Sequence, residues 1–229
     1  MEDFQSQNLS WISWKFPAFG CRMAVHHPMS VRTGILLVVS GPSGSGKTTL
    51  CKRLSDSGKA RHSISCTTRR PRHGEVDGDH YHFVTTAEFE AKLAAGEFLE
   101  SALVHGNRYG TLRSEVLDHL EAGTDVVMDI DVQGAAKVRA SDDAAIQRAL
   151  VDLFVMPESR EELEARLVGR GTDSAETIAL RMENALVEIS HWPEYTFRLL
   201  SKTPAEDYAK FEALLIAERL RISRCNDPH

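Results

Sequence analysis

Residues 35–50 read ILLVVSGPSGSGKTTL, which joins an apolar run to a glycine-rich turn and then to a lysine and two threonines. The unbroken branched run at 35–39 is typical of a strand buried on both faces of a parallel sheet. The turn has the complete spacing G-x-x-x-x-G-K-[ST], in which glycines let successive backbone N–H groups point at an anion. The stretch predicts a phosphate site at the carboxyl end of a first strand.

Each residue type in this glycine loop (residues 41–49) has an expected role. Lys47 reaches the outer phosphates, Thr48 offers a hydroxyl to Mg²⁺, and the helix that begins here adds its positive N-terminal dipole. The alternative is a glycine-rich connection without a ligand, against which the preceding strand and the following helix both argue. The residues predicted to hold the nucleotide are Gly41, Pro42, Ser43, Gly44, Ser45, Gly46, Lys47, Thr48 and Thr49.

Composition and charge exclude several classes of protein. The 229 residues, 42% hydrophobic and 26% charged, suffice for one core with a small inserted subdomain. No apolar run approaches the roughly 18 residues of a membrane span, and a net charge of −6 argues against a general nucleic-acid surface. The four scattered cysteines lack C-x-x-C spacing and predict free thiols in a reducing compartment, so we expect a soluble cytoplasmic protein.

Hydrophobic patterning predicts an α/β fold with an insertion. Residues 1–33 stay outside the fold, as a mis-started, disordered or targeting segment. The small mixed subdomain is expected to contain strands that start at 63 and near 81, strands at 98–104 and 108–111, and helices at 87–95 and 112–121. The core is expected to contain helices at 47–57, 132–138 and 205–222 and strands at 125–131, 150–155 and 195–200, with two charged helices within 160–189.

The first polar cluster consists of Ser65, Arg69, Arg72 and Tyr81. Arginine presents donors in a rigid fork that matches phosphate oxygens, and hydroxyl groups can complete the shell with neutral donors. The cluster therefore predicts binding of a phosphate monoester. The alternative is a solvated basic loop.

A second cluster could read a purine base. Guanine offers two adjacent donors, N1–H and the 2-amino group, where adenine has an acceptor at N1. The carboxylate of Glu100 in a closed pocket would accept twice from guanine and stay unpaired against adenine, while Thr111 and Ser65 could donate to guanine O6. The alternative for Glu100 is a surface acid.

Two acids and three arginines complete the candidates. Asp129 and Asp131 share one face if both lie on a strand, and both could approach the cation or the acceptor. Asp131 could instead cap the following helix. Arg166, Arg170 and Arg181 bracket the turn GRGTDS, as expected of a lid that closes over a transferring phosphoryl group, or they are ordinary surface charges.

The chain resembles the bacterial guanylate kinases, which are P-loop nucleoside monophosphate kinases, over residues 34–222. The resemblance rests on segments that read, in order after GPSGSGKT, SISCTTRRPRHGEVDGDHYHF, EFLESALVHGNRYGT, MDIDVQGA and RLVGRGTD. It implies a P-loop NTPase three-layer fold with a parallel central sheet, a mixed α+β GMP-binding subdomain at 62–123 and a helical lid at 158–189. The core would comprise 34–61, 124–157 and 190–222, followed by a tail at 223–229.

The resemblance also implies the reaction, which is transfer of the ATP γ-phosphoryl group to GMP, and to dGMP as well, with Mg²⁺ in purine nucleotide metabolism. From charge and composition we expect no nucleic-acid or membrane partner. The residues that match GMP-binding positions are Ser65, Arg69, Arg72, Tyr81, Glu100, Tyr109, Thr111, Asp129 and Asp131. The residues that match catalytic positions are Lys47, Arg69, Asp131, Arg166, Arg170 and Arg181, with Thr48 on the metal.

Two rival functions remain at this point. The first is a non-catalytic interaction module related to guanylate kinases, against which the intact Lys47, Thr48 and lid arginines argue. The second is a kinase for another phosphorylated acceptor, such as a ribosyl bisphosphate, against which Glu100 with Thr111 argues. Oligomeric state and the native start of the chain stay open.

Overall fold

The computed structural model describes residues 32–104, 106–169 and 175–224. Its larger sheet has five parallel strands in the order β2-β7-β1-β8-β9. The strands are β1 (Leu36–Ser40), β2 (Arg61–His62), β7 (Val126–Asp129), β8 (Leu150–Pro157) and β9 (Phe197–Ser201). The predicted parallel α/β layout is confirmed, with β1 in the middle of the sheet.

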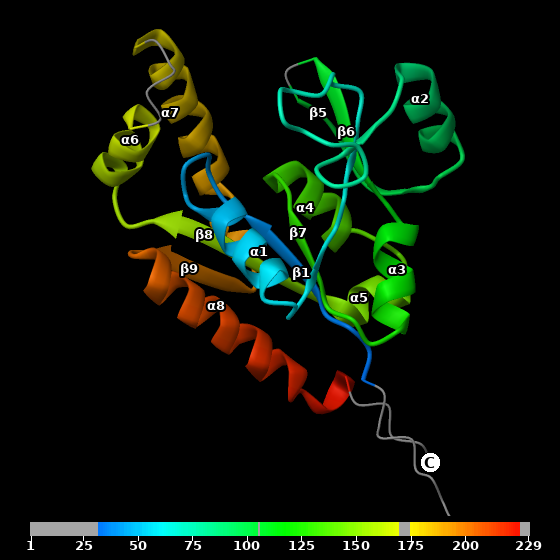
Figure 1. Ribbon diagram of the computed structural model, residues 1–229. Coiled ribbons are helices and arrows are strands. Elements are labelled where there is room, and N and C mark those ends of the chain that lie inside the picture. The colour runs from blue at the N-terminus through cyan, green and yellow to red at the C-terminus, as the bar shows by residue number, and fades with distance from the viewer. Residues whose placement is uncertain (1–31, 105, 170–174, 225–229) are drawn as a thin grey trace, which may run out of the picture.

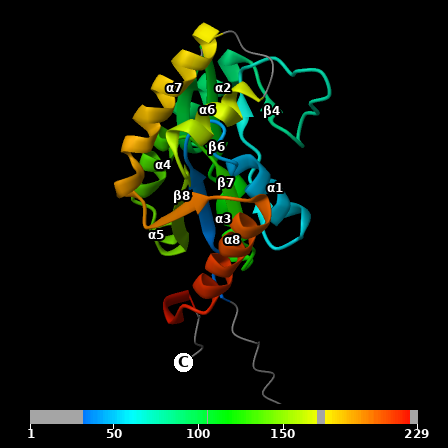
Figure 2. The ribbon, with the colours of Figure 1, turned by 90° about the vertical axis from the view of Figure 1, so that its left-hand side faces the viewer.

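Alternating side chains of β1 divide the core into two layers. Leu37 and Val39 pack on one face with α1 (Lys47–Asp56) and α8 (Pro204–Arg219). Leu36 and Val38 pack on the other face with α3 (Ser114–Glu121), α4 (Val132–Arg139) and α5 (Ala144–Ala149). Because both faces are covered, β1 has no exposed residue, and its first four residues are an unbroken apolar run. Figures 1 and 2 show the sheet between these two sets of helices.

The smaller, mixed sheet has the order β4-β3-β6-β5. Its strands are β3 (Cys66–Thr67), β4 (His82–Phe83), β5 (Phe98–Val104) and β6 (Asn107–Leu112), and α2 (Thr86–Ala94) covers it. Phe89 of α2 stacks on Phe98 with 4.4 Å between ring centroids, so this unit has its own apolar core.

A pair of helices, α6 (Arg160–Val168) and α7 (Ala175–Ser190), packs through Leu163, Leu167, Met182 and Ala185. In Figure 1 this pair and the smaller sheet stand on opposite sides of the loop between β1 and α1. A β-carbon added at Gly44 would lie 3.4 Å from Leu167, so α6 lies against the glycine loop.

Two sequence predictions need correction, and two further elements were not predicted. No strand starts at 63, because the backbone N–H of Ser63 still pairs with Val127 after β2 and the chain then crosses to β3 in the other sheet. The last long helix ends at Arg219, before a 3₁₀ turn η2 (Ile222–Arg224). The helix α5 and a 3₁₀ turn η1 (Trp192–Glu194) were not predicted.

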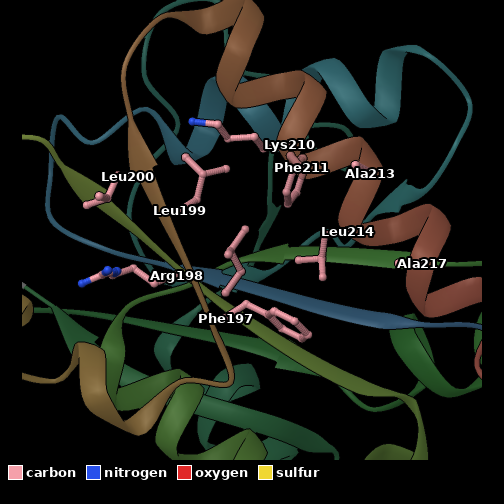
Figure 3. A pocket seen from close by; sticks show the side chains of 10 residues that line it. Phe197, Arg198, Leu199, Leu200, Lys210, Phe211, Ala213, Leu214 and Ala217 are labelled. Carbon is pink, nitrogen blue, oxygen red and sulfur yellow. The ribbon is translucent and has the colours of Figure 1, made fainter.

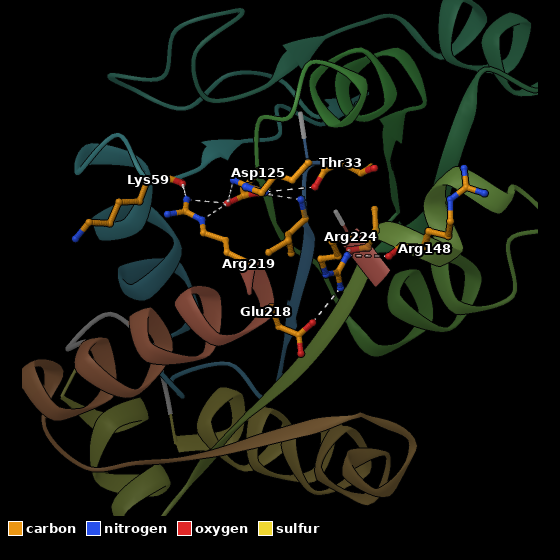
Figure 4. A network of polar contacts seen from close by, with 10 residues as sticks. Thr33, Lys59, Asp125, Arg148, Glu218, Arg219 and Arg224 are labelled. Atoms are coloured by element: carbon orange, nitrogen blue, oxygen red, sulfur yellow. Dashed lines mark hydrogen bonds and ion pairs between the residues drawn. The ribbon is translucent and has the colours of Figure 1, made fainter. Parts of the chain in front are cut away.

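A buried ionic cluster connects the two ends of the described chain (Figure 4). It lies at the end of the larger sheet opposite the glycine loop. The carboxylate of Asp125 accepts hydrogen bonds from Arg32, Arg219 and the backbone N–H of Ile35. Arg224 in η2 binds Glu218 and the carbonyl of Arg148. Removal of Asp125 would leave two guanidinium groups without their shared partner, so this cluster stabilises the fold away from the glycine loop.

An apolar groove of about 590 Å³ lies between β9 and α8 (Figure 3). Leu199, Phe211 and Leu214 line it, with Arg198 and Lys210 among the lining residues. It contains none of the predicted site residues. Within the part of the chain that the structure describes, no helix has the length and apolar character needed to span a bilayer.

Candidate functional site

The glycine loop has the backbone that its sequence predicts. Gly41, Gly44 and Gly46 have φ angles of +144°, +91° and +97°, which side chains rarely allow. A β-carbon at Gly41 would also lie 2.2 Å from the carbonyl oxygen of Val155, whereas nothing lies within 4 Å at Gly46. Gly41 is therefore required for close packing on β8, and Gly46 for its left-handed turn into α1.

Lys47 and Thr48 lie at the start of α1, at the carboxyl end of the sheet. The Lys47 ammonium group donates to the carbonyls of Gly41 at 2.7 Å and Pro42 at 3.2 Å, which folds the side chain over the loop. The Thr48 hydroxyl donates to Asp129 Oδ2 at 2.5 Å. Because β1 and β7 are parallel neighbours with Val39 opposite Asp129, the loop and this carboxylate meet at one edge.

Three of the residues predicted to bind the base form a connected chain of hydrogen bonds in the smaller sheet. The Thr111 hydroxyl donates to Glu100 Oε1 at 2.9 Å, and Ser65 Oγ lies 3.0 Å from Thr111 Oγ1. Glu100 and Thr111 are partners in the antiparallel β5–β6 pair, beside a register shift between Phe98 and Glu100. The smaller sheet therefore brings residues from three separate segments to one place.

Glu100 is a buried acid, with only 6% of its surface exposed. Burial raises the pKa of its carboxyl to about 7, and the charge of Asp131 adds to this effect while the Thr111 hydrogen bond opposes it. A β-carbon at Gly134 would lie 3.0 Å from Glu100 Oε2, so α4 closes one side of the acid. The surface-acid alternative for Glu100 is wrong.

Arg69 is held among aromatic rings and an acid. Its guanidinium carbon lies 5.5 Å from the ring centroid of Tyr81, and Tyr81 packs edge-on against Tyr109 at 5.9 Å. Its Nη2 donates to Glu75 Oε1 at 2.8 Å. Arg72 is exposed on the same loop, and its backbone N–H donates to Glu75 Oε2 at 2.7 Å. The structure thus brings together Arg69, Tyr81 and the backbone of Arg72, whereas Ser65 lies with Thr111 and Glu100.

Asp131 lies just beyond β7 and not on it. The strand ends at Asp129, so the expectation that both acids share one strand face is wrong. Asp131 is the N-cap of α4, where its Oδ1 accepts from the backbone N–H of Gly134 at 2.7 Å. The capping alternative is therefore observed, and the second carboxylate oxygen is left for any further role.

The predicted lid arginines have different surroundings. Arg166 on α6 donates to Ser201 Oγ at 3.0 Å and to Glu162 at 2.5 Å, and it lies 3.4 Å from the carbonyl of Ser45 in the glycine loop. Arg181 lies half-buried on α7. Arg170 falls outside the described residues, and α6 ends at Val168, so a shared helical face with Arg166 is not observed.

Two residues next to these clusters were not predicted from the sequence. Glu75 binds Arg69, and its position three residues after Arg72 within a glycine-bounded turn was the available signal. Ser201 links Arg166 to the buried Asp207 on α8, with 2.7 Å between Ser201 Oγ and Asp207 Oδ2. No local pattern marks Ser201, since its contact with Arg166 joins residues 35 positions apart in the chain.

Comparison with known proteins gives a consistent result over most of the chain. The family model described as Guanylate kinase matches residues 33–218. The chain is 48% identical over 194 residues to the guanylate kinase of Sphingopyxis alaskensis, covering 84% of this chain and 86% of that one. It is 42% identical over 201 residues to the guanylate kinase of Clostridium perfringens, covering 85% and 88%. The crystal structure of guanylate kinase from Anaplasma phagocytophilum superposes with a TM-score of 0.69 at 31% identity, covering 86% of this chain and 93% of that one.

Proposed function

Because this chain belongs to the guanylate kinase family and phosphorylates GMP with ATP, we propose that its predicted site residues carry out this reaction at the carboxyl end of the larger sheet. The observation that carries the proposal is the buried Glu100, hydrogen-bonded to Thr111 and flanked by Ser65. Burying an ionised carboxylate costs free energy unless other groups donate hydrogen bonds to it, and a bound ligand can supply these donors. Guanine supplies two such donors.

GMP binds, in this proposal, between the base-reading residues and the arginine cluster of the smaller sheet. The Glu100 carboxylate accepts from N1–H and the 2-amino group. The hydroxyls of Thr111 and Ser65, which carry one proton each, turn away from their present partners to donate to O6. Arg69 and Arg72 bind the phosphate with help from the hydroxyls of Tyr81 and Tyr109. None of these contacts needs the ribose 2′-hydroxyl, so dGMP is also a substrate.

ATP binds on the glycine loop, with its phosphates against the backbone N–H groups of residues 41–49. Lys47 exchanges its two carbonyl partners for phosphate oxygens, which are better acceptors for a charged donor. The Thr48 hydroxyl and the Asp129 carboxylate fit Mg²⁺, because oxygen ligands suit this ion and they already lie 2.5 Å apart. When bound, Mg²⁺ neutralises charge on the phosphoryl oxygens.

For phosphoryl transfer, the protein mainly has to align the two nucleotides and neutralise the charge on the transferring group. Lys47 and the lid arginines Arg166, Arg170 and Arg181 surround the transferring group, while Asp131 stays next to the acceptor. Exclusion of water is required, since an exposed site would hydrolyse ATP. We therefore assign residues 62–123 as a GMP-binding subdomain and 158–189 as a lid, both closing on a core of 34–61, 124–157 and 190–222.

The test is an assay of ADP release with ATP and Mg²⁺, comparing GMP with dGMP, AMP, UMP and a ribosyl bisphosphate. We expect turnover with GMP and dGMP and little with the other acceptors. Equal turnover of AMP would contradict the guanine assignment, and omission of Mg²⁺ should abolish activity. The free, buried thiols of Cys51 and Cys66 agree with a cytoplasmic location, which cell fractionation would test.

A further inference from the structure

We propose that Glu75 is a positioning residue for the acceptor phosphate, because its carboxylate fixes Arg69 and the backbone of Arg72 in the arrangement that binds GMP. This inference rests on the proposed function of the arginine cluster. The two carboxylate oxygens of Glu75 accept from Arg69 and from the Arg72 backbone, so its effect on the reaction passes through Arg69 and the loop that carries Arg72.

The two oxygens of the Glu75 carboxylate have different partners. Oε1 accepts from Arg69 Nη2 at 2.8 Å, and Oε2 accepts from the backbone N–H of Arg72 at 2.7 Å. The backbone N–H of Glu75 donates in turn to the carbonyl of Arg72 at 3.1 Å. One side chain thus connects one arginine fork with the backbone of the second arginine and closes the turn between them.

This arrangement restrains a side chain that would otherwise be flexible. The Arg69 and Glu75 side chains are only 14% and 17% exposed, and Arg69 also lies against the rings of Tyr81 and Phe83. A guanidinium group has five N–H donors. Glu75 and the carbonyl of Arg70 take one each, which leaves further donors for a phosphate.

Because Glu75 is negatively charged, a positioning role and a purely electrostatic role predict opposite effects of removing it. Hydrogen bonds from Arg69 and from the Arg72 backbone lower the pKa of the Glu75 carboxyl to about 2, so it is ionised at neutral pH. A negative charge next to a phosphate site repels the substrate. If attraction alone mattered, removal of Glu75 would tighten GMP binding, whereas loss of a restraint on Arg69 would weaken it.

The experiment compares steady-state kinetics of the full chain with Glu75→Ala, Glu75→Gln and the matched control Glu90→Ala. Glu90 is a suitable control because it also forms an ion pair with an arginine of the smaller sheet, Arg108, but lies on α2 and outside the arginine cluster. We expect Glu75→Ala to raise KM for GMP roughly ten- to hundredfold, with KM for ATP unchanged. Glu75→Gln should fall between Ala and wild type, because its amide has a single acceptor oxygen and keeps only one of the two hydrogen bonds. Glu90→Ala should match wild type.

A double-variant comparison tests whether Glu75 acts through Arg69. In an Arg69→Ala background, Glu75→Ala should raise KM for GMP by a clearly smaller factor than in the wild-type background, since one of the two groups that it positions is already gone and only the backbone of Arg72 remains. An equal fold-change in both backgrounds, or a lower KM for GMP in Glu75→Ala, would overturn the inference. Near-ultraviolet circular dichroism monitors folding, and Glu75→Gln carries the test if Glu75→Ala does not fold. Failure of wild type to phosphorylate GMP would count against the proposed function instead.

Discussion

Thr111 and Glu100 face each other across the β5–β6 pair, and the Thr111 hydroxyl donates a 2.9 Å hydrogen bond to the buried Glu100 carboxylate. Burial raises the pKa of that carboxyl to about 7. The group that we assign to guanine recognition therefore titrates near neutral pH before substrate binds. Selectivity, pH dependence and stability of the enzyme should all respond to this one side chain.

The first prediction concerns the pH dependence of GMP binding. Only the ionised Glu100 can accept from both guanine donors, so protonation competes with the base. We expect KM for GMP to rise about tenfold between pH 8 and pH 6, as the group with pKa about 7 gains its proton. Because the phosphate of GMP titrates near pH 6 as well, the matched control is the Glu100→Gln profile. Identical profiles for the two proteins would contradict the prediction.

The second prediction concerns the choice of base. Glu100→Gln presents an amide N–H₂ to a base edge that also donates, and it leaves one guanine donor unpaired. A buried unpaired donor costs about 1–3 kcal/mol, so kcat/KM for GMP should fall by roughly ten- to hundredfold. The same variant should use AMP no worse than wild type. If Glu100→Gln retained the preference of wild type for GMP over AMP, the base-reading assignment would be wrong.

The third prediction concerns stability. The raised pKa means that the folded protein holds the Glu100 proton more tightly than the unfolded chain does, so ionisation of Glu100 lowers stability as the pH rises through 7. Glu100→Gln removes this cost. Its free energy of unfolding without nucleotide should exceed that of wild type at pH 8 by about 3 kcal/mol, and the excess should shrink at pH 5. Urea unfolding at both pH values measures it, and a difference independent of pH would rule out the linkage.

The backbone conformation of the glycine loop could be predicted from the sequence because its turns and the helix start are local, whereas its packing against Val155 and Leu167 could not. Its glycine spacing determines the positive φ angles, and the position of Lys47 follows from the helix start. The contact between Thr48 and Asp129 could be predicted only in part. That contact needs β1 and β7 to be neighbours, which the rule for carboxyl ends of parallel strands suggests but does not specify.

The residues alone left alternatives open for the base-reading and phosphate-binding clusters, and only the resemblance decided between them. The reason is physical. Ser65 and Thr111 are 46 residues apart, and their contact follows from the register of β3, β5 and β6, which composition does not reveal. Glu75 was missed because an acid in a polar turn looks like any solvated charge. The role of Asp131 was ambiguous for the opposite reason, since one carboxylate can cap a helix and still border a site.

The fourth prediction separates these two roles of Asp131. Asparagine is as good an N-cap as aspartate, so Asp131→Asn should keep the free energy of unfolding close to that of wild type, whereas Asp131→Ala should lose about 1 kcal/mol. If the carboxylate also acts on the acceptor, both variants should lose kcat to a similar extent. Urea unfolding and ADP release on the same preparations give both numbers. Full activity in Asp131→Asn would reduce Asp131 to a cap.

The fifth prediction ranks glycine substitutions by stability. Gly41→Ala places a β-carbon 2.2 Å from the Val155 carbonyl oxygen at a positive φ, so strain and overlap add, and we expect a loss of about 3 kcal/mol or more. Gly46→Ala meets no neighbour within 4 Å and should lose only the backbone strain of about 1–2 kcal/mol. Gly58→Ala, at φ +70° in an equally open position after α1, should lose a similar amount while retaining ADP release.

Gly58→Ala is the control for Gly46→Ala, because both substitutions have the same backbone cost. Any additional loss of activity in Gly46→Ala therefore comes from a changed nucleotide loop. A Gly41→Ala protein as stable as Gly46→Ala would show that β8 can move aside, and would contradict the close packing of the loop on Val155.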